Sequence, residues 1–153
     1  MAQVSSPRKK FNFTIQIAPA PINPFLAQKV QIPEVAVDAT AHGDTNHDIK
    51  TGGRITYGNI QIEKISTTDG ADNYFFDWIN SIADPIIGGG LVPEEYKRLV
   101  TISELAEDGT SILNTWICTG CWPQKINGTD LDRMSSDNTV ESLELCVDLI
   151  EKL

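Results

Sequence analysis

The sequence has no apolar run long enough to cross a membrane, which takes roughly 20 residues in a helix. The basic trio Arg8-Lys9-Lys10 is followed by alternating apolar and polar residues, whereas a signal peptide would continue with an unbroken apolar stretch. Three cysteines are too few for a disulfide scaffold. We therefore expect a protein that is made in a reducing cytoplasm and has no membrane partner.

Basic residues are scarce, since 12 Lys and Arg stand against 21 Asp and Glu and give a net charge of 12 − 21 = −9. Proteins that grip nucleic acid neutralise phosphates with Lys and Arg, so this balance argues against tight DNA binding. The balance does not argue against a position close to DNA, because a protein that conducts a polyanion should repel that polyanion mildly. A length of 153 residues with 41% hydrophobic and 22% charged residues is typical of one globular domain, spanning residues 1–153.

Motifs for catalysis and cofactor binding are also missing. The only histidines, His42 and His47, share one polar segment, which leaves few ways to form a serine or cysteine triad. Residues 44–48 begin like a calcium-binding loop, but isoleucines stand where the pattern needs glycine and glutamate. Gly88-Gly89-Gly90 lacks the Lys-Ser/Thr of a P-loop. We expect no enzymatic activity, no metal site and no cofactor.

Two of the cysteines, Cys118 and Cys121, form a Cys-x-x-Cys pair in an extended segment, not at a helix start as in redox enzymes. On a straight strand they would lie roughly 10 Å apart on opposite faces. A disulfide needs Cα atoms within about 7 Å, and only a bend at Gly120 would bring them closer. We favour structural thiols, with a redox or metal role as the alternative. Cys146 shares the polar face of its strand, so a disulfide between subunits is a further hypothesis.

The first part of the chain is typical of strands separated by loops. Residues 11–17 alternate apolar and polar side chains, which predicts a half-buried strand after a flexible segment at residues 1–9. Three prolines predict a loop at residues 18–24. Residues 27–40 are extended, and Pro33 makes them an edge strand, a bulged strand or two short strands.

A long polar segment, residues 41–54, has no apolar period and predicts a loop, which at this length is usually functional or disordered. Residues 55–65 predict another strand, in which Gly58 is typical of a bulge. One helix is predicted next, with Thr68 or Asp69 as its N-cap and Asp72 near the positive end of the helix dipole. Pro85 is expected to end this helix. Its apolar face consists of Phe75, Trp78, Ile79 and Ile82.

The last part of the chain predicts strands at residues 96–105 and 111–118, joined by a hairpin turn at residues 107–110. Residues 139–150 predict a final strand, whose inward set is Leu143, Leu145, Val147 and Leu149. Many strands, one helix and no βαβ alternation predict a mainly β fold, a β-sandwich or small barrel with one packed α-helix. The predicted core consists of Phe11, Phe13, Ile15, Phe75, Trp78, Ile79, Ile82, Trp116, Leu143 and Leu145.

Seven segments follow the order of a known family: Lys10–Ile15, Tyr57–Ile60, Phe76–Ile79, the strand with Trp116, Cys121–Lys125, Gly128–Asp132 and Val140–Leu145. Each is weak alone, but together they cover nearly the whole chain. Through them the chain resembles the tail-tube proteins of contractile phages, which are similar to the Hcp-type tubes of bacterial injection systems. The resemblance implies a structural subunit whose sheets join those of its neighbours into a hexameric ring. Such rings would stack into a tube inside a contractile sheath.

The resemblance also implies where the protein acts and what it contacts. It would belong to a virion tail assembled in the host cytoplasm. Its partners would be copies of itself, the tail sheath protein, and the baseplate and tail-terminator proteins, while DNA passes without tight binding. Residues 41–54 would reach onto the adjacent ring as an inter-ring loop through His42, Asp44, Asn46, His47, Asp48, Lys50 and Arg54.

Acidic residues are expected to line the lumen of the tube, so that DNA slides without sticking. Strand parity, away from the apolar set, selects Glu34, Asp38, Glu144 and Asp148. Two close alternatives are a baseplate ring that initiates the tube and the tube of a bacterial contractile injection system. A more remote alternative is a monomeric β-sandwich that binds carbohydrate or peptide.

Overall fold

The computed structural model describes residues 11–18, 26–43, 46–66, 73–128 and 130–153. The expected flexible segment 1–9, residues 19–24 of the proline-rich loop and the helix-cap candidates Thr68, Asp69 and Asp72 lie outside this range. The strands are β1 Phe13–Ala18, β2 Leu26–Gln31, β3 Val35–Gly43, β4 Asp48–Tyr57, β5 Ile60–Ile65, β6 Arg98–Leu105, β7 Ile112–Ile126, β8 Val140–Cys146 and β9 Leu149–Lys152. The helices are α1 Tyr74–Ile82 and α2 Pro93–Tyr96.

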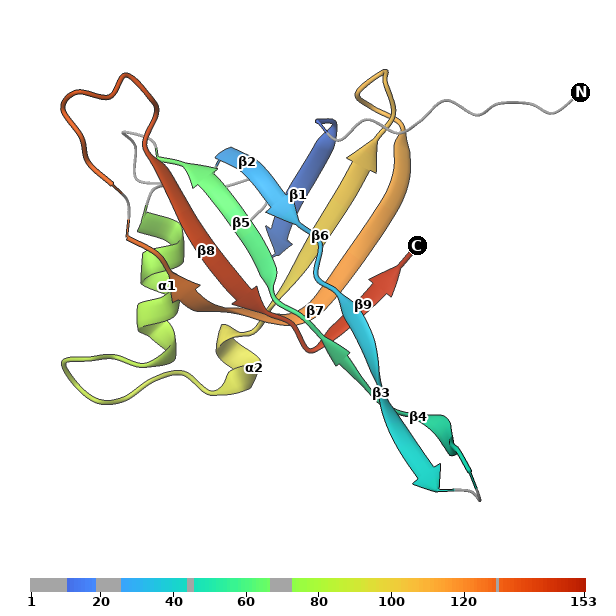
Figure 1. Ribbon diagram of the computed structural model, residues 1–153. Helices are drawn as coiled ribbons and strands as arrows, with labels where there is room; N and C mark the ends of the chain where they lie inside the picture. The colour runs from blue at the N-terminus through green and yellow to red at the C-terminus, as the bar shows by residue number, and fades with distance from the viewer. Residues whose placement is uncertain (1–10, 19–25, 44–45, 67–72, 129) are drawn as a thin grey trace, which may run out of the picture.

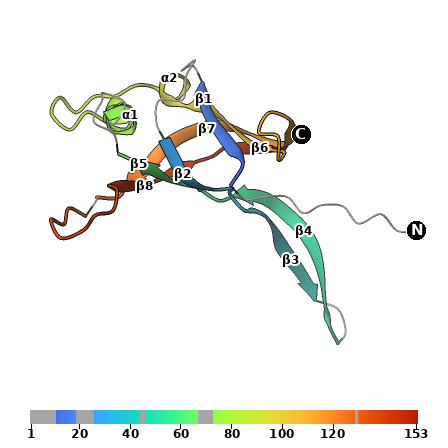
Figure 2. The same ribbon diagram turned by 90° about the horizontal axis from the view of Figure 1, so that it is seen from above.

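Seven strands form one antiparallel sheet in the order β1-β6-β7-β8-β5-β2, with β9 paired to β7. The long strand β7 belongs to both halves of this sheet, because its first part pairs with β6 and β9 and its last part pairs with β8. Figures 1 and 2 show the two halves turned toward each other, with α1 beside them. The fold is mainly β with one packed helix, and the prediction of fold class is confirmed.

The core lies between the two halves and under α1. Its fully buried apolar side chains are Ile15, Ile17, Ile60, Ile62, Phe75, Trp78, Val100, Ile102, Cys118, Cys121, Leu143 and Leu145. Trp78 fixes the helix in place, because its Nε1 donates to the Tyr96 carbonyl at 2.7 Å and its ring lies 4.6 Å from the Arg98 guanidinium.

The predicted core is only partly buried. Ile15, Phe75, Trp78, Leu143 and Leu145 are fully buried, while Phe13, Ile79, Ile82 and Trp116 are half-buried. Phe11 is wrong as a core residue, since its side chain is 75% exposed. The reason is that pairing between β1 and β6 begins at Phe13, opposite Glu104, so Phe11 precedes the sheet.

Three predicted segments are each divided between two strands in the structure. The segment at residues 55–65 breaks at Gly58, whose N–H donates to the Glu34 carbonyl at 2.9 Å, and residues 27–40 form two strands around Pro33. The segment at residues 139–150 breaks at Asp148, whose N–H donates to the Thr119 carbonyl at 3.0 Å. Beyond this break Leu149 is 42% exposed, so its place in the inward set is wrong.

The expected structureless loop at residues 41–54 is also wrong. β3 and β4 pair as an antiparallel hairpin from Val35 opposite Tyr57 to Gly43 opposite Asp48. This two-stranded sheet projects from the rest of the molecule (Figures 1 and 2). We call residues 35–57 the arm and the remaining described residues the body.

Candidate assembly surfaces

The arm has two chemically different faces. Cross-strand pairing places Val35 beside Tyr57 and Val37 beside Ile55 on one face, which we call the apolar face of the arm. By alternation the other face carries polar residues, among them Asp38 and the pair Thr40 and Thr51. Val35, Val37 and Ile55 are 58%, 56% and 56% exposed, so the apolar face is uncovered.

An uncovered apolar face on a two-stranded ribbon has a physical consequence. Such a ribbon is marginally stable alone in water and needs a third strand or a packing partner. In the part of the chain that the structure describes, the arm is an isolated two-stranded sheet. The arm is therefore a surface that a further chain is expected to cover.

The predicted inter-ring residues gather in this arm. His42 lies at the end of β3, Asn46 and His47 lie at the turn, and Asp48, Lys50 and Arg54 lie on β4; all are exposed. Asp44 lies outside the described residues. The His42 ring nitrogen Nε2 is 3.4 Å from Thr51 Oγ1. Among the described residues, no three His, Cys, Asp or Glu side chains are grouped to hold a metal ion.

A second surface lies between the two ends of the seven-stranded sheet. β1 and β2 are its outermost strands, so within the described chain each has one edge without a strand partner. A groove of about 980 Å³ runs between them, and Phe13, Val30, Ile32 and Ile102 line it. Lys29 and Glu104 contribute opposite charges to the same groove.

The outer face of strands β2, β5 and β8 is polar. Register places Gln31, Gln61 and Glu144 in one cross-strand row and Lys29, Glu63 and Ser142 in the next. Lys125 on β7 lies beside Glu144. We call this the polar sheet face; its charged side chains are Lys29, Lys125, Glu63 and Glu144, so two positive and two negative charges balance.

The four predicted lumen residues do not form one group. Glu34 and Glu144 line the same hollow at the edge of the polar sheet face, together with Gln31 and Gln61. Asp38 lies on the arm, and Asp148 lies between β8 and β9. Strand parity found Glu144 correctly as an outward residue but could not tell which surfaces meet in space.

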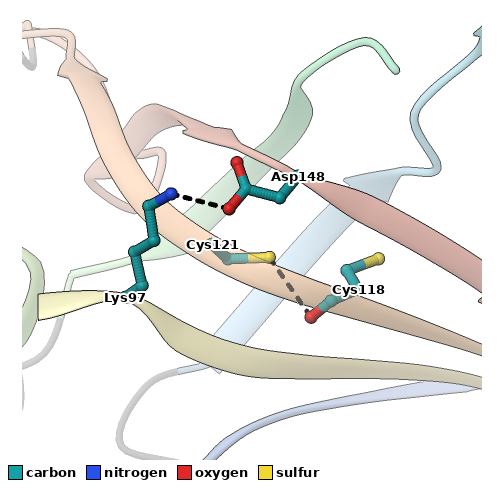
Figure 3. A network of polar contacts seen from close by, with 4 residues as sticks. All are labelled: Lys97, Cys118, Cys121 and Asp148. Carbon is teal, nitrogen blue, oxygen red and sulfur yellow. Dashed lines mark hydrogen bonds and ion pairs between the residues drawn. The ribbon is translucent and has the colours of Figure 1, made fainter. Parts of the chain in front are cut away.

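Asp148 belongs to a contact network around the cysteine pair (Figure 3). Its Oδ2 accepts a hydrogen bond from Lys97 Nζ at 2.6 Å, and this partner raises the pKa of Lys97 above its usual value. Gly120 has φ +69°, and a Cβ there would come within 2.3 Å of Asp148 Oδ2. Gly120 sits in a bulge, because Arg98 and Val100 on β6 pair with Cys121 and Cys118.

The bulge explains why both thiols of the Cys-x-x-Cys pair are buried. One extra residue on β7 lets Cys118 and Cys121 face the core together, each with no exposed surface. Cys121 Sγ donates to the Cys118 carbonyl at 3.4 Å, and its hydrogen bonding with Cys118 together with burial raises the Cys121 pKa. All three cysteines are free. Cys146 is half-buried and its Sγ donates to Gln124 Oε1 at 3.1 Å.

Two features were missed by the sequence reasoning. The first is Lys64, which is 1% exposed and forms an ion pair with Glu141 at 2.9 Å. The sequence signal for its burial is that alternation along β5 places Lys64 on the same face as the buried Ile60 and Ile62. The other is the turn after α1, where Asp84 Oδ1 accepts from the backbone N–H of Ile86 at 2.8 Å and of Ile87 at 3.2 Å. This turn presents Ile86 and Ile87, which are 92% and 84% exposed.

These surfaces are typical of a subunit that completes its fold by contact with other chains. No helix among the described residues is long and apolar enough to cross a membrane. The family model of the T4-like virus tail tube protein gp19 matches residues 9–151, and the chain belongs to this family. No curated protein matches the sequence.

Solved structures give the same fold. The chain is similar to one in the anti-feeding prophage cap, a tube-terminating cap, with a TM-score of 0.82 at 21% identity, covering 100% of this chain and 95% of that one. A chain in the sheath-tube complex of an extracellular contractile injection system gives 0.78 at 25% identity, over 98% and 93%. Hcp1 from Flavobacterium johnsoniae gives 0.55 at 15% identity, over 93% and 94%.

Proposed function

We propose that this chain is a subunit of the inner tube of a contractile tail, in which six copies close into a ring and rings stack into a hollow tube that conducts DNA. The observation that carries the proposal is the incompleteness of the single subunit. Open sheet edges at β1 and β2 and an uncovered arm are surfaces that proteins rarely leave exposed. A closed ring of identical subunits would satisfy both.

The surroundings of such a tube follow from the same proposal. The tail sheath protein would surround the tube, and baseplate and terminator proteins would meet its ends. The particle would be a virion tail assembled in the host cytoplasm. The arm, with Lys50 and Arg54 exposed on β4, would contact another copy and is the candidate for the link between rings.

The polar sheet face is our candidate for the lumen, with Glu34 and Glu144 as the acidic residues at its edge. Its balanced charge and the −9 net charge of the chain give DNA no strong attraction. Charge reversal by Glu144→Lys should leave the tube intact and slow DNA ejection. Glu94→Lys, on the exposed first turn of α2, is the matched control. Unchanged ejection from intact Glu144→Lys tubes would remove this face as the DNA path.

The test of the main proposal is negative-stain electron microscopy of the purified chain at high concentration. We expect rings or tubes with a central hole and six-fold symmetric averages. Rings that never stack would favour a tube-initiating baseplate ring, and a tube that assembles with a non-phage sheath would favour a bacterial contractile injection system. A chain that stays monomeric, also when the baseplate is supplied to nucleate it, would contradict the proposal and favour a binding module.

A further inference from the structure

The pairing of the arm changes register part of the way along its length. Val37 lies opposite Ile55, and the next cross-strand pair joins Ala39 to Gly52, so one residue of β3 lies opposite two residues of β4. This is a β-bulge, which bends the bulged strand and increases its local twist. It divides the arm into an inner part next to the body, residues 35–37 and 55–57, and an outer part next to the turn, residues 39–43 and 48–52.

Two adjacent glycines, Gly52 and Gly53, lie on β4 at this bulge. A Cβ at Gly53 would lie 3.1 Å from the Asp38 carbonyl oxygen, so the close approach of the two strands favours glycine there. Gly52 is different, because its φ is not positive and a Cβ would make an ordinary contact of 3.5 Å with Val37 Cγ1. This conformation of the arm therefore does not need glycine at position 52. What glycine adds there is backbone freedom, since it reaches conformations that other residues disfavour.

Each part of the arm is held together by its own cross-strand contacts. In the inner part, Thr56 Oγ1 donates to the Ala36 carbonyl at 3.4 Å. In the outer part, Thr51 Oγ1 lies 3.4 Å from the Thr40 carbonyl and 3.4 Å from His42 Nε2. These contacts lie on either side of the bulge, so each part can keep its pairing while the angle between the two parts changes.

The base of the arm is less free to bend than the bulge. Pro33 precedes β3, its side chain is buried, and its ring fixes φ. The backbone N–H of Gly58 donates to the Glu34 carbonyl at 2.9 Å, and a Cβ at Gly58 would lie 3.0 Å from Glu34 Cγ. Because the two strands are bonded and closely packed here, bending is expected within the arm and not where the arm joins the body.

The outer part has no contact that fixes its direction. Among the residues that the structure describes, β3 and β4 pair only with each other. Every residue of the outer part is exposed, and the arm projects from the body (Figures 1 and 2). A ribbon of two strands with no packing partner has little to resist bending at its weakest point.

We propose that the arm bends at a hinge formed by Asp38, Gly52 and Gly53, about which the outer part changes its angle to the inner part while both keep their pairing. This inference goes beyond the proposed function, because the hinge is a property of the single chain. It separates the direction of the outer part from that of the body. The exposed end of the arm can then adapt its direction after the body has been fixed in place.

Double electron–electron resonance tests the hinge in the full chain at low concentration. Spin labels are placed in a Cys146→Ser background, since the other two cysteines have no exposed surface. One label is carried by Glu94→Cys on the body, and the second by Ala41→Cys on the outer part or Ala36→Cys on the inner part; all three sites are exposed. We expect a broad distribution of distances for the outer site and a narrow one for the inner site.

A β-branched residue at position 52 should remove the freedom. Gly52→Val should narrow the outer distribution to about half its width, because its side chain restricts the backbone and packs beside Val37. Gly52→Ala should narrow it less, and its methyl group is small enough to leave the pairing in place. Gly43→Val is the matched control, since a Cβ there has open space, and should leave the width unchanged. Cross-strand NOEs in both parts check that each variant keeps its hairpin.

Three results would overturn the hinge. An inner distribution as broad as the outer one would place the bending at the base of the arm, and two narrow distributions would mean that the arm is rigid. An outer distribution that Gly52→Val leaves unchanged, or that Gly43→Val narrows equally, would place the flexibility outside the bulge. None of these results bears on whether the chain forms rings, so failure of the hinge and failure of the proposed function are distinguishable.

Discussion

The arm and the body are both antiparallel β structure, but they are stabilised in different ways. In the body, alternate side chains such as Ile60 and Ile62 are 0% and 1% exposed and belong to the hydrophobic core. In the arm, Val35 and Val37 alternate in the same way, yet more than half of each side chain is exposed. The difference shows that two strands can pair without burying their side chains. Burial of those side chains can then come from contact with another molecule.

The largest expected effect is in the body. Trp78→Ala should lower the free energy of unfolding by about 3–5 kcal/mol, because it removes a buried ring together with its bond to the Tyr96 carbonyl. Val37→Ala in the arm should change the stability of the unassembled chain by less than about 0.5 kcal/mol. Urea unfolding of both variants measures the contrast, and equal losses would mean that the arm is already packed in the monomer.

The next effect concerns the buried ion pair. Lys64→Ala should cost about 3 kcal/mol, since it leaves Glu141 without its partner at a site that is 16% exposed. Lys64→Met combined with Glu141→Leu should recover most of that loss, because no lone charge remains. Lys50→Ala on the arm is the matched control. A double variant as unstable as Lys64→Ala would show that the pair contributes more than charge compensation.

A smaller effect is expected at the bulge in β7. Gly120→Ala should cost about 1–2 kcal/mol, because the left-handed backbone at φ +69° disfavours a side chain. Combining it with Asp148→Gly removes both the carboxylate and the Cβ that the new Cβ would meet, so the part of the loss that comes from this clash should be recovered. Gly43→Ala on the arm, where a Cβ would have open space and φ is not positive, should cost less. Thermal unfolding distinguishes these cases.

The smallest effect is a pH dependence at the turn between β6 and β7. Hydrogen bonds from the backbone and side chain of Ser111 and the backbone of Thr110 lower the Asp108 pKa to about 2. Because this pKa lies below the unfolded value of about 3.9, the contribution of Asp108 to stability is full above that value. It is lost as the pH falls through about 2. An NMR titration of its carboxyl group should give that midpoint, and a midpoint near 4 would mean that the turn is open in solution.

Local pattern predicted the body better than the arm. Period-two alternation at residues 11–17 and helical spacing from Phe75 to Ile82 report contact with a core, so they located β1 and α1. Residues 41–54 have no core behind them, and their pairing is carried by backbone hydrogen bonds with residues such as Thr40 and Ala41 on β3. Hydrophobic periodicity reflects the burial of side chains, so it does not detect a hairpin whose side chains stay exposed.

The remaining differences arise where a strand changes partners. Nothing local marks Asp148 as the point where the chain leaves the last part of β7 and returns to its first part. Likewise, straight-strand geometry puts Cys118 and Cys121 on opposite faces, and only the bulge at Gly120 turns both inward. These are long-range properties of the sheet, and they depend on residues far apart in sequence.

The long strand β7 has a mechanical consequence. It is shared by both halves of the body, pairing with β6 and β9 along its first part and with β8 along its last. Any load that tries to shear one half past the other is therefore carried along the covalent backbone of a single strand. Hydrogen bonds between separate strands yield under a much smaller force than peptide bonds do, so the two halves could not be pulled apart without stretching or bending this strand.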